Sequence, residues 1–236
     1  MPTVLITGAN RGLGLEFARQ YAQQNWRVLA ACRGVSEQLR ELAAGHESLS
    51  VHLLDVTDAT GIRRLADELK DQPIDVLLNN AGRFGRGSFG DSTVDSQSFG
   101  QIDYDDWQQT LAVNLMGPMR MAEQFVEHVA ASEQRKIVTL TSMLGSMELN
   151  TTGGLYAYRS SKAAVNAVVK SMAIDLAGRG ILAVAIHPGW VRTDMGGPGA
   201  QIDPGPAVAG MREVIAGLVP GQLGRVIAYD GQVLPY

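Results

Sequence analysis

A tyrosine and a lysine, Tyr158 and Lys162, stand four positions apart in a stretch rich in alanine, valine and methionine. Apolar residues recur there at intervals of three and four, which predicts a long, largely buried helix over Gly154 to Leu176. Residues four apart share one face of a helix, so the ammonium should lie near the phenol. Such a charge lowers the pKa of a phenol by roughly 1–3 pKa units. The pair predicts a tyrosine that exchanges protons near neutral pH, as carbonyl–alcohol interconversion requires; a chance pairing on a helix is the alternative.

A glycine-rich turn is the second feature with chemical meaning. The β-branched run Thr3 to Thr7 predicts a strand, Leu15 to Gln24 predicts a helix, and Gly8-Ala9-Asn10-Arg11-Gly12-Leu13-Gly14 joins them. Glycine permits positive backbone torsions and close approach of a phosphate, and a helix N-terminus offers unpaired N–H groups. The turn therefore predicts dinucleotide binding, although its T-G-x-x-x-G-x-G spacing differs from the usual G-x-G-x-x-G. The predicted cofactor contacts in this turn are Gly8, Asn10, Arg11, Gly12, Leu13 and Gly14.

The end of the second predicted strand, Arg27 to Cys32, bears on the choice of cofactor. An acidic residue usually binds the adenosine ribose diol of NAD at this point, but here the chain continues Arg33-Gly34 without a carboxylate. Arg11 and Arg33 would suit a ribose phosphate, which a guanidinium can grip at two points. The prediction is NADP(H) in preference to NAD(H), the alternative being that either arginine points to solvent. Cys32 is interpreted as a small buried side chain rather than a redox switch.

The order of apolar runs predicts the architecture. Strand patterns alternate with helical patterns, which indicates a parallel sheet covered by helices on both faces. The predicted fold class is α/β, a Rossmann-type doubly wound sheet, in a single domain over residues 1–236. Ligands of such sheets bind at the carboxyl ends of the strands. The further predicted strands are Leu49–Leu54, Ile74–Leu78, Lys136–Thr141, Leu182–Ile186 and Arg225–Tyr229; the further predicted helices are Ser36–Ala44, Thr60–Lys70, Tyr104–Ala131 and Ala207–Leu218.

Composition narrows the function classes. The 236 residues are 45% hydrophobic with a net charge of −4 and no runs of lysine or arginine, which argues against nucleic-acid binding. A single cysteine excludes an intrachain disulfide framework and fits a reducing compartment. The start lacks the features of a signal peptide, and no apolar run is long enough to span a membrane. These features predict a cytoplasmic protein without a membrane partner, and the four histidines show no grouping that predicts a metal site.

Several motifs together resemble a known family. Along the chain stand T-G-A-N-R-G-L-G at Thr7–Gly14, N-N-A-G at Asn79–Gly82, Asn114 in A-V-N-L, Ser142, the Tyr158/Lys162 pair and Pro188-Gly189. This order is similar to that of the short-chain dehydrogenases/reductases, and the resemblance covers essentially the whole chain. Within that family the chain resembles the sniffer-like carbonyl reductases, a group that includes the C-factor-like proteins. The residues that carry this closer resemblance are Ala157–Lys162, Pro188–Met195 and Tyr229–Tyr236.

The resemblance implies a catalytic set. Tyr158 would protonate a carbonyl oxygen as hydride arrives from the nicotinamide, and Lys162 would hold the nicotinamide ribose and keep the phenol acidic. Ser142 would donate a hydrogen bond to the same oxygen, with Thr141 and Ser146 as rivals for that role. Asn114 would hold a water that passes protons to Lys162, unless it is a structural asparagine within a helix.

The resemblance also implies the remaining cofactor contacts and an assembly. Asp55 and Val56 would contact the adenine, and Asn80, Ala81 and Gly82 its ribose. After the sixth strand, Val191 and Thr193 would reach the carboxamide, next to Pro188 and Gly189. Tyr158 and Lys162 would also contact the cofactor. Self-association as a homodimer or homotetramer is implied through the helices Tyr104–Ala131 and Tyr158–Leu176.

The substrate pocket is the least specified part. It should be bounded by Met143, Leu144, Trp190, Phe84 and the segments Gly85–Phe99 and Met195–Pro204, the last either a lid or a solvated loop. These side chains favour an apolar or aromatic carbonyl compound. The predicted function is an NADPH-dependent reductase of ketones or aldehydes, with reversible oxidation of the alcohol. The alternatives are a C-factor-like signalling or nucleotide-binding protein with little turnover, and an epimerase or dehydratase that uses the same pair.

Overall fold

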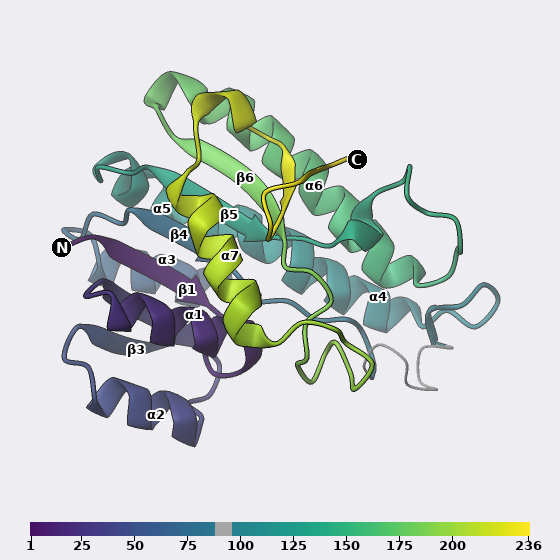
Figure 1. Ribbon diagram of the computed structural model, residues 1–236, viewed down its shortest axis with the longest axis horizontal. Helices are drawn as coiled ribbons and strands as arrows, with labels where there is room; N and C mark the ends of the chain where they lie inside the picture. Colours follow the sequence, from purple (N-terminus) through teal and green to yellow (C-terminus); the bar gives the residue numbers. More distant parts are fainter. Residues whose placement is uncertain (88–95) are drawn as a thin grey trace.

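A computed structural model of the chain describes residues 1–87 and 96–236. One eight-stranded sheet forms its centre, in the order β3-β2-β1-β4-β5-β6-β7-β8 (Figure 1). The chain adds β2 and β3 on one side of β1 and then returns to add β4 on the other side. The carboxyl ends of β1 and β4 therefore form the switch point at which doubly wound sheets bind ligands. The strands are β1 Thr3–Thr7, β2 Arg27–Cys32, β3 Leu49–Leu53, β4 Val76–Asn79, β5 Lys136–Leu140, β6 Leu182–His187, β7 Val226–Ala228 and β8 Val233–Leu234.

Helices cover both faces of the sheet, as the alternating sequence pattern predicts. Figure 1 shows α1, α2 and α7 on the near face and α3, α5 and α6 on the far face. Alternate residues of β1 point to opposite faces of the sheet. Val4 and Ile6 lie in the core under α1 and α7, and Leu5 lies in the core under α3 and α5. The helices are α1 Gly12–Gln23, α2 Glu37–Ala44, α3 Ala59–Glu68, α4 Tyr104–Leu111, α5 Gly117–Ala130, α6 Tyr156–Leu176 and α7 Pro204–Ala216. The predicted fold class is confirmed.

The last strand departs from the predicted parallel sheet. β8 pairs antiparallel with β7, and the two strands form a hairpin at the edge of the sheet. Its turn contains Asp230-Gly231, with Gly231 at φ +89°, a residue pair favoured in tight hairpins because glycine accepts this torsion. A two-residue strand is too short to show an alternation of apolar and polar residues, so the sequence pattern predicted only the strand before the turn.

The predicted long helix Tyr104–Ala131 is present, but it contains a π-turn that had not been predicted from the sequence. The structure contains α4, then a π-turn over Ala112–Met116, then α5. Pro118 explains the interruption, because it has no N–H to donate to the carbonyl of Asn114 four residues earlier. The chain widens at this point, and the N–H of Gly117 bonds to the carbonyl of Ala112, five residues back. Such π-turns inside helices occur frequently at functional sites.

Among the described residues, no helix has both the length and the apolar character needed to cross a membrane.

Candidate active site

The helix α6 places the predicted tyrosine–lysine pair at the carboxyl ends of the central strands. Tyr158 lies in the first turn of α6 and Lys162 one turn later, and both side chains are buried. Nζ of Lys162 donates a hydrogen bond of 2.9 Å to the carbonyl of Leu140, the last residue of β5. The same nitrogen lies 5.8 Å from the centre of the Tyr158 ring. The sequence prediction that the two side chains share one face is confirmed.

A short loop after β5 packs tightly on this pair. A Cβ atom added to Gly145 would lie 2.9 Å from Cβ of Lys162, so any larger residue would push the loop from α6. Ser142, at the start of this loop, is buried and hydrogen-bonded to the phenol of Tyr158. Its two rivals are engaged elsewhere, because Thr141 donates to Oδ1 of Asn166 and Ser146 donates to the carbonyl of Tyr236. Of these three hydroxyls, Ser142 is the one beside the phenol.

Asn114 lies in the π-turn and faces the same site. Its Oδ1 accepts from the N–H of Arg83 at 2.8 Å, and its Nδ2 donates to the carbonyl of Arg83 at 2.8 Å and to Oγ of Ser161 at 3.0 Å. A Cβ atom built on Gly82 would lie 3.4 Å from Oδ1 of Asn114 and 3.8 Å from Nζ of Lys162. The Asn114 side chain therefore ties the loop after β4 to α6, next to the lysine.

The protonation of the tyrosine differs from the sequence expectation. Burial raises the pKa of Tyr158 to about 12, and its hydrogen bond with Ser142 only partly offsets that rise. Burial also lowers the pKa of Lys162 to about 8. The expected lowering of the pKa of the phenol is therefore wrong, because loss of solvent around the buried phenol has the largest effect on its pKa.

The glycine turn has the geometry that a phosphate cradle needs. Gly8 and Gly12 adopt positive φ angles of +70° and +53°. A Cβ atom on Gly14 would lie 2.2 Å from the carbonyl oxygen of Gly8, so only glycine fits there. Arg11 occupies the N-cap position of α1 without a side-chain cap, and Leu13 follows in the first turn of the helix. The start of α1 has no side-chain cap, so its N–H groups can bind a pyrophosphate, and the three glycines leave room for it.

Two residues that support this turn had not been predicted. Oγ1 of Thr7 accepts from the N–H groups of Asn80 and Ala81, while Nδ2 of Asn80 donates to the carbonyls of Thr7 and Gly8. Ser36 caps α2 and donates at 2.6 Å to the carbonyl of Asn10. Asn80 was predicted to line the ribose, and in the structure its amide holds the glycine turn. Thr7 stood inside the quoted motif, whereas nothing local linked Ser36 to the turn.

The residues expected around the adenosine lie beyond β2 and β3. Arg33 is exposed, and its charge acts on the carboxyl of Asp55. Burial would raise the pKa of Asp55, but hydrogen bonds from Thr57 and the charge of Arg33 outweigh it, so the pKa lies below its ordinary value. Val56 is buried and packs close to Gly117 at the start of α5.

Arg11 does not lie free beside the cleft. Its guanidinium donates to Asp194 at 2.7 Å, and both side chains are largely exposed. A ribose phosphate would have to compete with this ion pair, which solvent screens and which contributes little to stability.

The segment after β6 closes the opposite side of the glycine turn. Gly189 has φ +83°, and a Cβ atom there would lie 2.5 Å from Cδ1 of Ile202. Val191 is buried and pairs with Ile202 in an isolated bridge. Cγ2 of Thr193 lies 3.4 Å from a Cβ position on Gly12, so this segment faces the turn. Pro188 is half-buried at the end of β6.

Of the apolar residues expected at the substrate pocket, Phe84 lies beside the phenol. The ring of Phe84 packs on that of Tyr158 with centres 4.9 Å apart. Met143 and Trp190 are exposed, and Nε1 of Trp190 donates to the carbonyl of Gly196. Part of the expected Gly85–Phe99 cover lies outside the described residues.

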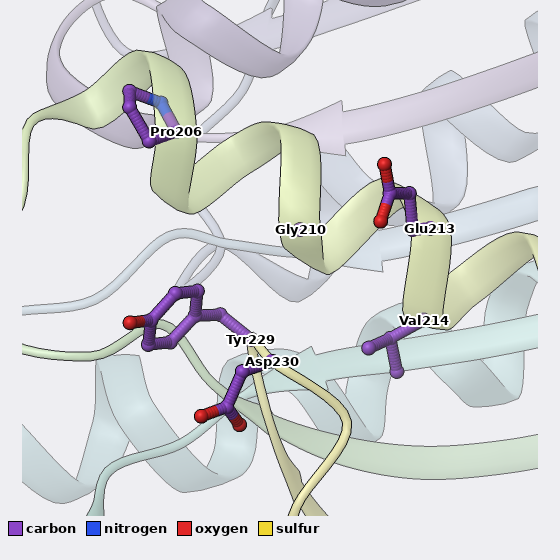
Figure 2. Close-up of a pocket in the computed structure, with 6 residues that line it drawn as sticks. All are labelled: Pro206, Gly210, Glu213, Val214, Tyr229 and Asp230. Carbon is purple, nitrogen blue, oxygen red and sulfur yellow. The ribbon is translucent and has the colours of Figure 1, made fainter.

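A surface hollow lies away from these residues. It has a volume of about 450 Å³ and lies between α7 and the end of β7 (Figure 2). Figure 2 shows Glu213 of α7 and Tyr229 and Asp230 of the β7–β8 turn at its edges. None of the predicted site residues lines it. Across residues 1–87 and 96–236, no three histidine, cysteine or acidic side chains group as a metal site would require.

Comparisons with known proteins agree with this geometry. A family model described as short chain dehydrogenase matches residues 2–201. The chain is 40% identical to the C-signal of Myxococcus xanthus over 175 residues, which are 74% of this chain and 100% of that protein. It superimposes on the carbonyl reductase Sniffer of D. melanogaster with a TM-score of 0.90 and 32% identity, over 100% of both chains. It also matches an NADPH-bound carbonyl reductase from chicken fatty liver with a TM-score of 0.88 and 28% identity, over 100% of this chain and 99% of that one.

The family match spans most of the chain, and two of these relatives are at least 30% identical. The chain is therefore a short-chain, nicotinamide-dependent oxidoreductase of the short-chain dehydrogenase family, in the subgroup of the Sniffer-like carbonyl reductases and the C-signal.

Proposed function

We propose that this protein is an NADPH-dependent reductase that transfers hydride to the carbonyl carbon of a ketone or aldehyde. The observation that carries the proposal is the convergence of Tyr158, Ser142 and Lys162 at the carboxyl ends of the strands, next to the glycine turn. When bound, the reduced nicotinamide supplies the hydride. The residues of this chain supply the proton and the polar contacts for the carbonyl oxygen.

Tyr158 is proposed as the proton donor. A phenol with a pKa near 12 is protonated throughout the neutral range, so the free protein holds it in the form that reduction requires. As the carbonyl carbon gains the hydride, the oxygen takes the phenolic proton, and the phenolate then regains a proton from Lys162 or from solvent. Ser142 donates a hydrogen bond to the same oxygen, which stabilises the charge that develops there. Oxidation of an alcohol would instead need the phenolate, which the buried site disfavours before the cofactor binds.

Lys162 is proposed to hold the ribose next to the nicotinamide and to supply positive charge beside the phenolate. Its ammonium is partly deprotonated near pH 8 in the free protein, because burial lowers its pKa. Binding of a polyanionic cofactor would favour the protonated form again. Oδ1 of Asn114 accepts the backbone N–H of Arg83, which follows Gly82. Asn114 lies in the π-turn, and its proposed role is to support proton supply to Lys162 from that position.

The preference for NADPH over NADH rests on Arg33, the first residue after β2. The guanidinium is exposed, and no carboxylate takes its place at that strand end. The carbonyl reductase from chicken fatty liver, which has NADPH bound, supports the same choice. The ratio of kcat/KM for NADPH to that for NADH should fall about tenfold or more in Arg33→Ala, since one guanidinium–phosphate contact is worth more than 1 kcal/mol. A wild-type preference for NADH would contradict the assignment.

The proposed substrates are apolar or aromatic carbonyl compounds, because the Phe84 ring packs on the phenol and Met143 and Trp190 are exposed apolar side chains. Bulky aromatic ketones and small aliphatic aldehydes should differ in kcat/KM with NADPH, and we expect the aromatic ones to be better substrates. Equal rates for charged and apolar carbonyls would count against a pocket of this character.

A second candidate function is a nucleotide-binding signal protein with little turnover. The identity to the C-signal over the whole of that protein favours it. NADPH consumption against a panel of ketones and aldehydes separates the two functions, with Tyr158→Phe as the decisive variant. We expect turnover in the wild type, a fall in kcat of roughly 10²- to 10⁴-fold in the variant, and unchanged NADPH binding. Absence of turnover across the panel, with NADPH bound, would favour the signalling function.

A further inference from the structure

The helix that carries Tyr158 begins without a cap of its own. The N-cap residue Leu155 has φ +53° and offers no side-chain acceptor. The first N–H groups of any helix have no partner within the helix, and a buried unpaired N–H is costly. The third residue of α6 is Tyr158 itself, so one of these N–H groups belongs to the proposed proton donor.

The missing acceptor comes from Gln97, 61 positions earlier in the chain. Its Oε1 accepts the N–H of Tyr158 at 2.9 Å. The Gln97 side chain is buried, with 1% of its surface exposed. A distant amide therefore does for α6 what a serine or aspartate normally does locally at a helix start.

The other end of the same amide binds the loop after β4. Nε2 of Gln97 donates to the carbonyl of Phe84 at 2.8 Å. Because the Phe84 ring packs on the ring of Tyr158, one side chain fixes both the backbone of the tyrosine and the residue that covers it. Only a group with an acceptor and a donor can make both bonds, which glutamine provides and a carboxylate does not.

The surrounding loop is shaped around this amide. Gly85 has φ +122°, and a Cβ atom there would lie 2.7 Å from Nε2 of Gln97 and 2.9 Å from Oδ2 of Asp106. Asp106 is buried, pairs with the guanidinium of Arg83 and accepts the N–H of Arg86. The loop is thus held on two sides, by Asp106 toward α4 and by Gln97 toward α6.

We propose that Gln97 is a positioning residue for carbonyl reduction, and that its amide fixes the position of the Tyr158 phenol relative to the substrate carbonyl. This inference rests on the proposed reductase function. Gln97 does not touch the reacting atoms, so its effect should appear in the chemical step and leave cofactor binding unchanged.

The test compares Gln97→Met with Gln101→Met. Methionine keeps the length of the side chain and removes both hydrogen bonds, while Gln101 is an exposed glutamine on the same segment. In Gln97→Met we expect kcat to fall roughly 10- to 100-fold, because small misplacements of a catalytic group have effects of this size. NADPH affinity should stay unchanged, and hydrogen exchange at the Tyr158 amide should become faster. Gln101→Met should match the wild type in all three measurements.

A second variant separates the two bonds. In Gln97→Glu, the carboxylate still accepts the N–H of Tyr158 but repels the carbonyl of Phe84. Exchange at Tyr158 should then stay slow while kcat lies between those of Gln97→Met and the wild type.

Two results with Gln97→Met would overturn the inference. One is unchanged kcat, whether or not exchange at Tyr158 becomes faster; the other is a loss of kcat matched by an equal loss of NADPH-binding sites, which would indicate partial unfolding. A wild-type protein that reduces no carbonyl would count against the proposed function alone. In that case, faster exchange at Tyr158 in Gln97→Met would still support the cap, and unchanged exchange would still overturn it.

Discussion

Two walls of the candidate active site are built in different ways. The glycine-turn wall, Thr7 to Gly14 with Asn80, depends on backbone torsions and on contacts to backbone carbonyls. The α6 wall, with Tyr158, Lys162, Ser142 and Asn114, depends on buried side chains that reach across the chain, such as Asn114 to Arg83 and Gln97 to Tyr158. The first wall should fail when atoms are added, and the second when hydrogen bonds are removed.

Addition of a single methyl group to the glycine-turn wall should have the largest effect. In Gly14→Ala the new Cβ would meet the carbonyl of Gly8, so the turn must move. We expect a loss of about 3 kcal/mol in the free energy of unfolding and NADPH binding at least about tenfold weaker, measured by urea denaturation and calorimetric titration.

Gly178→Ala is the matched control, because nothing lies within 4 Å of a Cβ atom there. It should leave both quantities close to those of the wild type. Normal NADPH affinity in Gly14→Ala would show that the turn is not the phosphate cradle.

The α6 wall should respond most strongly to loss of the Asn114 amide. Asn114→Ala leaves the buried backbone groups of Arg83 and the hydroxyl of Ser161 without their partner. We expect a loss of about 2 kcal/mol in the free energy of unfolding and a fall in kcat beyond that explained by stability. Asn150→Ala, which removes one exposed local bond, should change neither by a comparable amount. A stability loss without any change in kcat would make Asn114 purely structural.

The contrast between local backbone features and long-range side-chain contacts also explains how much of the structure the sequence could predict. The strands Thr3–Thr7 and Arg27–Cys32 agree with prediction to the residue, because both are short apolar runs between strong turn residues. The glycine turn and the Tyr158/Lys162 spacing are local signals of the same kind. The π-turn also had a signal, Pro118, inside an otherwise helical pattern.

Other features had no local signal. Gln97 lies in a polar loop, and its bond to Tyr158 spans 61 positions, so nothing near it in the chain marks it as a cap. The direction of the pKa change at Tyr158 depends on how completely the folded chain excludes water, which four-residue spacing does not reveal. Features marked by local residue types could be predicted, whereas the Gln97 cap and the pKa of Tyr158 depend on burial by distant parts of the chain and could not.

The charge on the α6 wall should shape the pH dependence. The pKa of Lys162 lies near 8 in the free protein, below its ordinary value, so the ammonium is charged below that pH and neutral above it. Since kcat/KM for NADPH reports the free enzyme, it should be level below pH 8 and fall by up to about tenfold per pH unit above it.

Lys136 provides the control, because burial lowers its pKa too but it lies at the opposite end of β5. Lys136→Gln should keep the fall near pH 8. A profile that stays level to pH 10, where an ordinary lysine titrates, would remove Lys162 from cofactor binding.

The smallest expected effect tests whether Ser36 adds to the support that the Thr7 and Asn80 side chains give the glycine-turn wall. Ser36 caps α2 and also donates to the carbonyl of Asn10, whereas Asp58 caps α3 outside this wall. Ser36→Ala and Asp58→Ala should each lower the free energy of unfolding by about 1 kcal/mol, the usual cost of a lost cap. Only Ser36→Ala should also weaken NADPH binding, by a few-fold, because the turn loses a bond that fixes its backbone. Equal NADPH affinity in the two variants would mean that the Ser36 hydroxyl does not help to hold the turn, which would leave the torsions and the contacts of Thr7 and Asn80 as its support.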